Sequence, residues 1–330
     1  MAGRPETEHP GPQGQNAPEQ PTDLPARSWW AVLRRTVHEA RDDNLTDWAA
    51  ALTYYSVLAI FPALLVLVAL LGIFGQYPHT TNELLKIVGK VGPHSAVDTF
   101  RQPIESVVRN KGGAGALLGV GLLGAIWSAS GYVGAFMRAA NVIYEVPEGR
   151  RFWKLRPLQI LVTLCMVLAA AVVALSIVTT GPLAKAIGDT IGLGHAAVLA
   201  WDIGKWPVLL IVVITMFSVL YYAAPNVRLP GFRWVSPGGI LAVVVWLVAS
   251  LAFGVYVTYV GSYNATYGSL GAVIIFLVWF WLTNAALLLG LEFNAELERR
   301  REIEAGDPDA DESLQLPLRG RPNRRHAAHA

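Results

Sequence analysis

Charged residues and cysteine are scarce in this sequence of 330 residues. Asp, Glu, Lys and Arg make up 15% of the chain and hydrophobic residues 53%, whereas about 25% of a soluble domain is typically charged. The single cysteine, Cys165, excludes an internal disulfide, and it lies in an apolar run where a thiol is most often a packing residue. The composition therefore argues against a soluble enzyme.

Sequence motifs for metal, nucleotide and nucleophile chemistry are missing as well. The seven histidines are scattered, and no HExxH or CxxC group is present. The sequence also has no phosphate-binding glycine loop and no serine nucleophile elbow. We therefore expect no enzyme activity, no catalytic residue, no resident metal and no cofactor.

Long apolar runs are what the sequence does contain. About 20 apolar residues in a helix cross the hydrocarbon layer of a bilayer, so each run predicts a transmembrane helix. The expected fold class is all-α, a polytopic membrane protein whose transmembrane domain covers residues 49–298. Its six spans are expected at about 50–74, 113–136, 157–181, 203–224, 237–260 and 270–292.

The segments outside these spans have different compositions. Residues 1–27 have no apolar core, which predicts a disordered tail and no cleavable signal peptide. Residues 28–48 predict an amphipathic helix at the membrane surface, and the first external loop, 75–112, predicts two short amphipathic helices. Residues 299–330 are charged and then rich in proline and arginine, which predicts a disordered cytoplasmic tail.

Basic residues gather at one end of the predicted spans. The cationic side of a membrane protein is usually the cytoplasmic one, so both termini are expected in the cytoplasm. The positive charges of loop 75–112 run against this bias. The residues that set the bias are Arg34, Arg35, Arg41, Arg138, Arg150, Arg151, Lys154, Arg156, Arg228, Arg233, Arg299, Arg300 and Arg301.

Two features of the spans bear on helix packing. Pro62 lies inside the first span, where its missing N–H predicts a kink. The second span carries small residues four apart, and this spacing lets another helix backbone approach closely. Tight packing is the simpler interpretation, and a groove or moving interface is the alternative. The residues concerned are Gly115, Gly119, Gly124 and Ser128.

Polar side chains in or beside the spans are the candidates for a functional site, because they are costly in hydrocarbon without a partner. A carboxylate at the depth of Glu292 favours its protonated form or a cation, and Arg138 is a candidate partner. A structural ion pair and a proton or substrate relay both fit that pair. For the tyrosines, hydrogen bonds between helices and a solvated cavity both stay open. The candidates are Asp47, Tyr54, Tyr55, Arg138, Asn141, Tyr267, Asn284 and Glu292.

Several short segments match one known family, in order, over about residues 30–300. They are DNLTDWAAALTYYS (43–56), IWSASG (126–131), ANVIY (140–144), RRFW (150–153), PGFRWVSPG (230–238), YGSLGAVI (267–274) and LGLEFNAEL (289–297). Through them the chain resembles the YihY/BrkB family of bacterial inner-membrane proteins. The resemblance implies a multi-pass protein of the bacterial cytoplasmic membrane with six helices and cytoplasmic ends.

The resemblance also adds Tyr144 and Asn294 to the candidate residues. Members of the family long carried the label ribonuclease BN, which is generally regarded as a misassignment, and other relatives are suspected of moving lipids. The resulting hypothesis is a transporter or flippase of a lipid or other anionic amphiphile, with membrane lipids and no nucleic acid as partners. A non-transporting envelope scaffold is the alternative, and a membrane-bound ribonuclease is a remote third.

Overall fold

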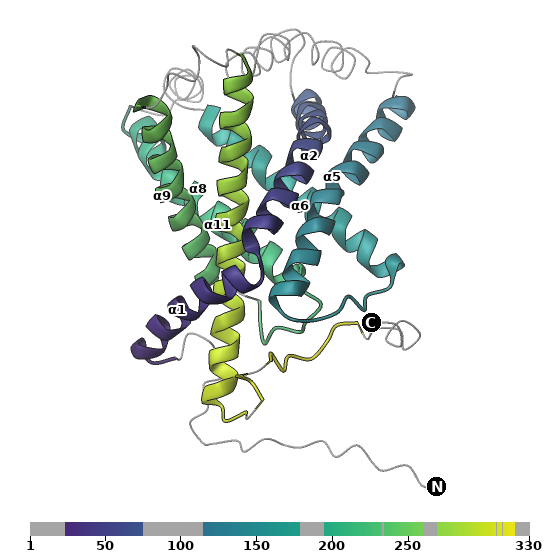
Figure 1. Cartoon of the computed structure of the whole chain (residues 1–330). Coiled ribbons are helices and arrows are strands. Elements are labelled where there is room, and N and C mark those ends of the chain that lie inside the picture. The colour runs from purple at the N-terminus through teal and green to yellow at the C-terminus, as the bar shows by residue number, and fades with distance from the viewer. Residues whose placement is uncertain are drawn as a thin grey trace. The chain divides into compact units, whose positions relative to one another are not determined.

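The computed structural model describes residues 24–74, 115–178, 195–232, 234–259, 269–307, 309–311 and 313–320. These residues form helices joined by turns, with one isolated β-bridge and no named strand. The all-α fold class is therefore confirmed for this part of the chain. The helices are α1 (Ala26–Asp42), α2 (Leu45–Phe74), α5 (Gly115–Ile143), α6 (Phe152–Val178), α8 (His195–Ala223), α9 (Pro237–Tyr259) and α11 (Ser269–Glu304) (Figure 1).

The six helices from α2 to α11 lie on the six predicted spans. Four described stretches are long and apolar enough to cross a membrane: Phe152–Val173, Ile203–Ala223, Pro237–Tyr259 and Val273–Glu304. By length and composition the chain is thus a membrane-spanning protein, and the count of six spans stays a prediction. Tyr267, most of the first tail and the two helices expected in loop 75–112 lie outside the described residues.

The chain divides into two compact units. Unit 1 comprises Met1–Ala50, Met137–Arg151 and Phe217–Ala330, and unit 2 comprises Ala51–Phe136 and Phe152–Met216. The helices α2, α5 and α8 contribute one end to unit 1 and their remainder to unit 2, whereas α9 and α11 belong wholly to unit 1.

Glycines bring α9 and α11 together in unit 1 (Figure 1). A Cβ at Gly238 would collide with the backbone oxygen of Gly290. A Cβ at Gly290 would lie only 2.7 Å from the Cβ of Ala242 and 2.7 Å from the hydroxyl of Tyr221. Backbones that approach this closely gain van der Waals contact that larger residues would prevent.

The helix α1 packs across α11 in the same unit (Figure 1). Trp29 and Val32 of α1 meet Phe293 and Leu297 of α11, and the rings of Trp29 and Phe293 lie 6.0 Å apart. The single helix expected over 28–48 is interrupted after Asp42, because Asn44 takes a left-handed conformation with φ of 53°. Asparagine tolerates that conformation better than most residues do. Location of α1 at a membrane surface stays a prediction.

Unit 2 is built on contacts of α5 with α6 and α2. A Cβ at Gly134 would lie 3.1 Å from the side-chain nitrogen of Gln159, and one at Gly131 would lie 4.0 Å from the ring of Tyr55. The Arg156 guanidinium lies 3.9 Å from the centre of the Trp127 ring and donates to the Trp127 carbonyl oxygen at 2.8 Å. Both the stacking and the hydrogen bond attach α6 to α5.

The predicted close packing at Gly124 and Ser128 is not what the structure has. Within the described residues nothing lies within 4 Å of the place where a Cβ would stand at Gly124, and Ser128 is exposed. A close contact lies further along α5, at Gly134, and Gly131 is in ordinary van der Waals contact with Tyr55. The surroundings of Gly115, Gly119 and Pro62 lie outside what the structure describes.

The chain after residue 299 also differs from the expected disordered tail. The helix α11 continues to Glu304, and the following segment folds back over unit 1. Leu314 and Leu316 are buried there, and Leu318 forms an antiparallel bridge with Val227. Charged residues of this segment, which the sequence analysis placed in a solvent-exposed tail, form ion pairs: Arg300, Arg301 and Asp311.

Replacement of Gly238 by alanine tests the contact between α9 and α11. We expect Gly238→Ala to lower the free energy of unfolding by about 1–3 kcal/mol, because overpacking forces the two backbones apart. The measurement is the thermal unfolding midpoint of the purified protein in detergent. Gly254→Ala is the matched control on the same helix, since nothing lies within 4 Å of its Cβ position. Equal midpoints for the two variants would contradict the contact.

Candidate functional site

A pocket of about 260 Å³ opens in unit 1 beside the end of α8, the start of α9 and the last third of α11. This volume is near the lower limit of small-molecule sites, about 300 Å³. Aromatic rings form much of its wall, and a few polar groups converge on it. The aromatic residues are Tyr144, Tyr221, Tyr222 and Phe232, and the polar ones are Ser218, Ser236, Asn294 and Glu298.

Hydrogen bonds at the start of α9 fix one wall of the pocket. Ser236 precedes the helix, and its hydroxyl accepts from the Gly239 N–H at 3.0 Å, as a capping side chain does. The Ser236 N–H in turn donates to the Ser218 hydroxyl at 2.9 Å. Asn294 of α11 accepts from the Gly238 N–H at 2.8 Å. Asn294, predicted as a site residue, therefore satisfies a backbone donor at a helix end and also lines the pocket.

A second group of polar contacts joins three connecting segments of unit 1. The Asn226 N–H donates to the Asn141 side-chain oxygen at 2.8 Å, and the Asn226 amide donates to Pro147 and Gly320 carbonyl oxygens. Asn141 also donates to Glu148 at 3.0 Å. The sequence candidate Asn141 thus holds the chain after α5 to the chain after α8.

The Arg150 guanidinium completes this group of contacts. It donates to Glu148 at 2.7 Å and to the Ala224 carbonyl oxygen at 2.8 Å. Although burial raises the pKa of Glu148, hydrogen bonds from Arg150 and Asn141 hold that pKa below its usual range. Glu148 is therefore a fixed negative charge that positions its neighbours.

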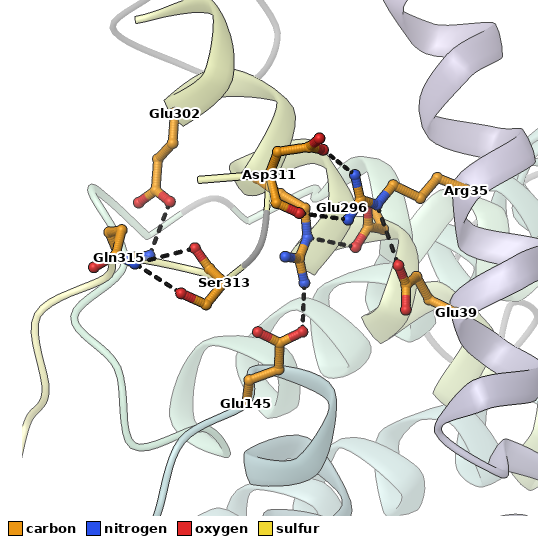
Figure 2. A network of polar contacts seen from close by, with 9 residues as sticks. Arg35, Glu39, Glu145, Glu296, Glu302, Asp311, Ser313 and Gln315 are labelled. Carbon is orange, nitrogen blue, oxygen red and sulfur yellow. Dashed lines mark hydrogen bonds and ion pairs between the residues drawn. The ribbon is translucent and has the colours of Figure 1, made fainter. Parts of the chain in front are cut away.

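An ion-pair network runs along the last turns of α11 (Figure 2). Arg35 of α1 pairs with Glu39 at 3.2 Å, with Glu296 at 3.0 Å and with Asp311 at 2.6 Å. Arg299 pairs with the other oxygen of Glu296 at 2.9 Å and with Glu145 at 2.7 Å. Two guanidiniums therefore connect α1, α11, the chain after α5 and the C-terminal segment.

Negative charge exceeds positive charge in this region. Asp43 lies close enough to Glu39 and Glu145 for their charges to act on it, although Arg299 opposes them. Burial is the largest cause, and together with these carboxylates it raises the pKa of Asp43 to about 6. Both Arg35 and Arg299 are already bound to other carboxylates.

Two buried polar atoms of unit 1 lack a hydrogen-bond partner among the described residues. They are the hydroxyl of Tyr144 and one carboxyl oxygen of Glu292. The two residues are 0% and 1% exposed. Burial, followed by the charges of Glu298 and Glu292, raises the pKa of the Tyr144 phenol. Since most buried polar groups have a partner, these two atoms mark a place where one is needed.

The structure brings four sequence candidates together in unit 1 and separates others from them. Asn141, Tyr144, Glu292 and Asn294 all lie in this region. The partnership expected between Arg138 and Glu292 is absent from the ion pairs of the described residues, because Arg138 is exposed whereas Glu292 is buried.

The remaining candidates are not part of the pocket. Asp47 is exposed, and Asn284 is buried with its amide donating to the Phe280 carbonyl oxygen at 3.0 Å. Tyr54 and Tyr55 belong to unit 2, where their rings lie 5.5 Å apart and Tyr54 is 62% exposed. For these tyrosines, hydrogen bonds between helices and a solvated cavity both stay predictions.

Sequence reasoning missed several residues of the site, above all those on the last turns of α11. A usable signal existed, since Glu292, Glu296 and Arg299 are four and three residues apart and so share one helix face. The charge of the segment made it look like a solvated tail. The missed residues are Arg35, Glu145, Ser218, Tyr221, Ser236, Glu296, Glu298 and Arg299.

Metal-ligating side chains do not gather in groups of three or more within the described residues. The arrangement instead offers hydroxyl, amide and carboxylate groups beside aromatic rings. These groups can bind the polar part of a molecule whose remainder is apolar.

Comparison with known proteins gives one family and several bacterial relatives. The sequence profile of the family described as virulence factor BrkB matches residues 36–315. The "Putative ribonuclease-like protein YfkH" of Bacillus subtilis (strain 168) is 32% identical over 275 residues, which cover 83% of this chain and 96% of that protein.

Two further relatives are named UPF0761 membrane protein. That of Alkalilimnicola ehrlichii is 28% identical over 269 residues, covering 78% of this chain and 56% of the relative. That of Chromohalobacter salexigens is 28% identical over 294 residues, covering 84% of this chain and 67% of the relative. This chain thus matches only about half of the Alkalilimnicola protein's length. No solved structure matches the chain.

The raised pKa of Asp43 predicts a pH dependence of stability. The folded protein holds this proton up to about pH 6, whereas the unfolded chain releases it near pH 3.8. The stabilisation is therefore fully present below about pH 4 and is lost as the pH rises to about 6. We expect the unfolding midpoint of the wild type, minus that of Asp43→Asn, to fall over this interval and then level off. A difference that rises with pH would contradict the raised pKa of Asp43.

Shortening of the chain tests the contacts of the C-terminal segment. A stop codon at position 313 removes two buried leucines, Leu314 and Leu316, and the hydrogen bonds between Gly320 and Asn226. We expect a loss of about 2 kcal/mol or more, the order of burying one leucine. A stop codon at position 321 is the control and should leave the thermal midpoint in detergent unchanged. Identical midpoints for both truncations would show that the segment does not pack.

Proposed function

Because the chain belongs to the virulence factor BrkB family of membrane proteins, we propose that it is a transporter that moves a lipid or another amphiphile across the bacterial cytoplasmic membrane. In this proposal the pocket of unit 1 holds the polar head of the transported molecule. It lies at the end of the spans where the basic residues gather, which is the predicted cytoplasmic side.

The unpartnered hydroxyl of Tyr144 is the observation that carries the proposal. This hydroxyl is buried and has no hydrogen-bond partner in the described residues, and Tyr144 is one of the residues that line the pocket. Leaving such a group unsatisfied costs about 1–3 kcal/mol. A polar head that occupied the pocket would provide the missing partner and remove this cost.

An amphiphile also needs an apolar surface for its hydrocarbon chain. The helix α9 starts at the pocket and presents exposed apolar side chains along its length: Ile240, Val244, Leu247, Val248 and Leu251. In a membrane such side chains lie against lipid. The tail of a bound lipid would therefore stay in hydrocarbon while its head is in the pocket.

The charge of the lining favours one class of head. Glu298, which is paired with Arg301 at 2.8 Å, provides a carboxylate, and no Lys or Arg is among the lining residues. Aromatic rings beside a carboxylate bind ammonium groups well. We therefore propose a zwitterionic, amine-bearing head for this pocket, rather than the anionic amphiphile expected from the sequence.

Transport assays in liposomes test the proposal. We expect fluorescent phosphatidylethanolamine to cross the bilayer faster in vesicles with the purified protein than in empty vesicles. The increase should be smaller for phosphatidylglycerol. Tyr144→Phe should slow the movement of phosphatidylethanolamine on the order of tenfold, because one hydrogen bond is worth about 1 kcal/mol or somewhat more. Tyr54→Phe is the matched control, since Tyr54 is largely exposed and belongs to unit 2.

The same preparation separates the other two hypotheses. Wild-type movement no faster than in empty vesicles, for every labelled lipid, would overturn the transporter. Stable stoichiometric partners after crosslinking, with no lipid movement, would instead favour the scaffold. Cleavage of RNA by the pure protein would favour a nuclease, in line with the name of the Bacillus relative.

A further inference from the structure

Glu292 is a buried acid that the pocket does not use. It lies on α11 one turn before Glu296, is 1% exposed and is not among the lining residues. One of its carboxyl oxygens has no hydrogen-bond partner in the described residues. A carboxylate buried without a cation is costly, by several kcal/mol, whereas a protonated carboxyl is not.

The charged groups that face Glu292 come from every element near it. Glu39 of α1, Asp43 in the turn after it and Glu296 of α11 act on it as like charges, and Arg299 acts as an opposite one. Arg299 is already paired with Glu296 and Glu145. Tyr144, from the chain after α5, is close enough for the charge of Glu292 to act on its phenol.

Arg35 provides no compensation either. Its guanidinium pairs with Glu39, Glu296 and Asp311 (Figure 2). The two arginines of this network are therefore bound to other carboxylates. The positive charge that Glu292 can bind at the lowest free energy is a proton. A proton needs no further space in a site this closely packed.

Tyr144 connects this acid with the pocket. Tyr144 is one of the lining residues, as is Glu298. The negative charges of Glu298 and Glu292 and the positive charge of Arg319 act on its phenol. A positive charge that enters the pocket beside Tyr144 would thus act on Glu292 as well. Opposite charge within a few ångströms favours the ionised form of an acid.

We propose that Glu292 binds a proton in the empty protein and releases it when an amine-bearing head enters the pocket. The carboxyl O–H bond breaks, the proton passes to water, and the ammonium group of the ligand replaces its charge. Proton and ligand then oppose each other's binding by the same factor, because coupling between two sites is reciprocal. The proton site stands on Glu292 alone, whereas its coupling to the pocket rests on the proposed transport function.

Infrared spectroscopy of the purified protein tests the proton site without any ligand. We expect the C=O stretching band of a protonated carboxyl at pH 7 in the wild type and its loss in Glu292→Gln. That variant keeps the shape and neutrality of the protonated acid, so it should fold. Glu298→Gln is the matched control and should keep the band. Identical spectra for wild type and Glu292→Gln would overturn the proton site.

Addition of short-chain phosphatidylethanolamine tests the coupling. We expect the band to weaken and a pH dye in weak buffer to report proton release, with neither effect in Glu292→Gln. Short-chain phosphatidylglycerol, a lipid without an amine, tests whether the amine is needed. Free ethanolamine, an amine without a lipid tail, tests whether the tail is needed. A band that no amine-bearing compound changes would overturn the coupling. If the liposome assay shows lipid movement and infrared spectroscopy shows no band of a protonated carboxyl, the proton site is rejected and the transport proposal stands.

Discussion

The paired contacts of Arg299 are the interaction on which unit 1 depends. This guanidinium is 3% exposed, and it joins Glu296 of α11 to Glu145 in the turn after α5. Glu145 takes a left-handed conformation with φ of 54°, which costs roughly 1–2 kcal/mol for a residue with a Cβ. Its ion pair with Arg299 holds it there. The neighbouring residue, Tyr144, is thereby kept at the wall of the pocket.

The same network leaves Glu292 without an ion pair among the described residues. Because Glu296 is shared by Arg35 and Arg299, both guanidiniums of the network are used to hold α1, α11 and the connecting segments together. Buried ion pairs stabilise little on net, but they specify one arrangement where the alternatives would leave charges unpaired. The structural use of these arginines is thus what leaves Glu292 available for a proton.

The pocket also depends on contacts that a linear pattern does not contain. Gly290 and Gly238 let α11 approach the start of α9, and Asn294 and Ser236 then satisfy backbone donors that this start leaves unpaired. Sequence analysis found Asn294 only through its family resemblance, and it missed Ser236, Ser218 and Tyr221. Each of these side chains has an ordinary local setting in the sequence, and its role appears only where residues 18 to 66 positions apart meet.

The sequence by itself determined the helical class, the position of the long helices and the family. These follow from hydrophobic runs, whose length and lack of charge are local properties. It also pointed to Glu292, because an acid beside an apolar run is unusual on its own. The tertiary structure alone decided that Arg138 is not the partner of Glu292 and that Gly134 rather than Gly124 makes a close contact of α5. It also decided that charged residues after 299 form ion pairs. The physical reason is that charge pairing and close packing depend on which distant segments meet, whereas hydrophobic length does not.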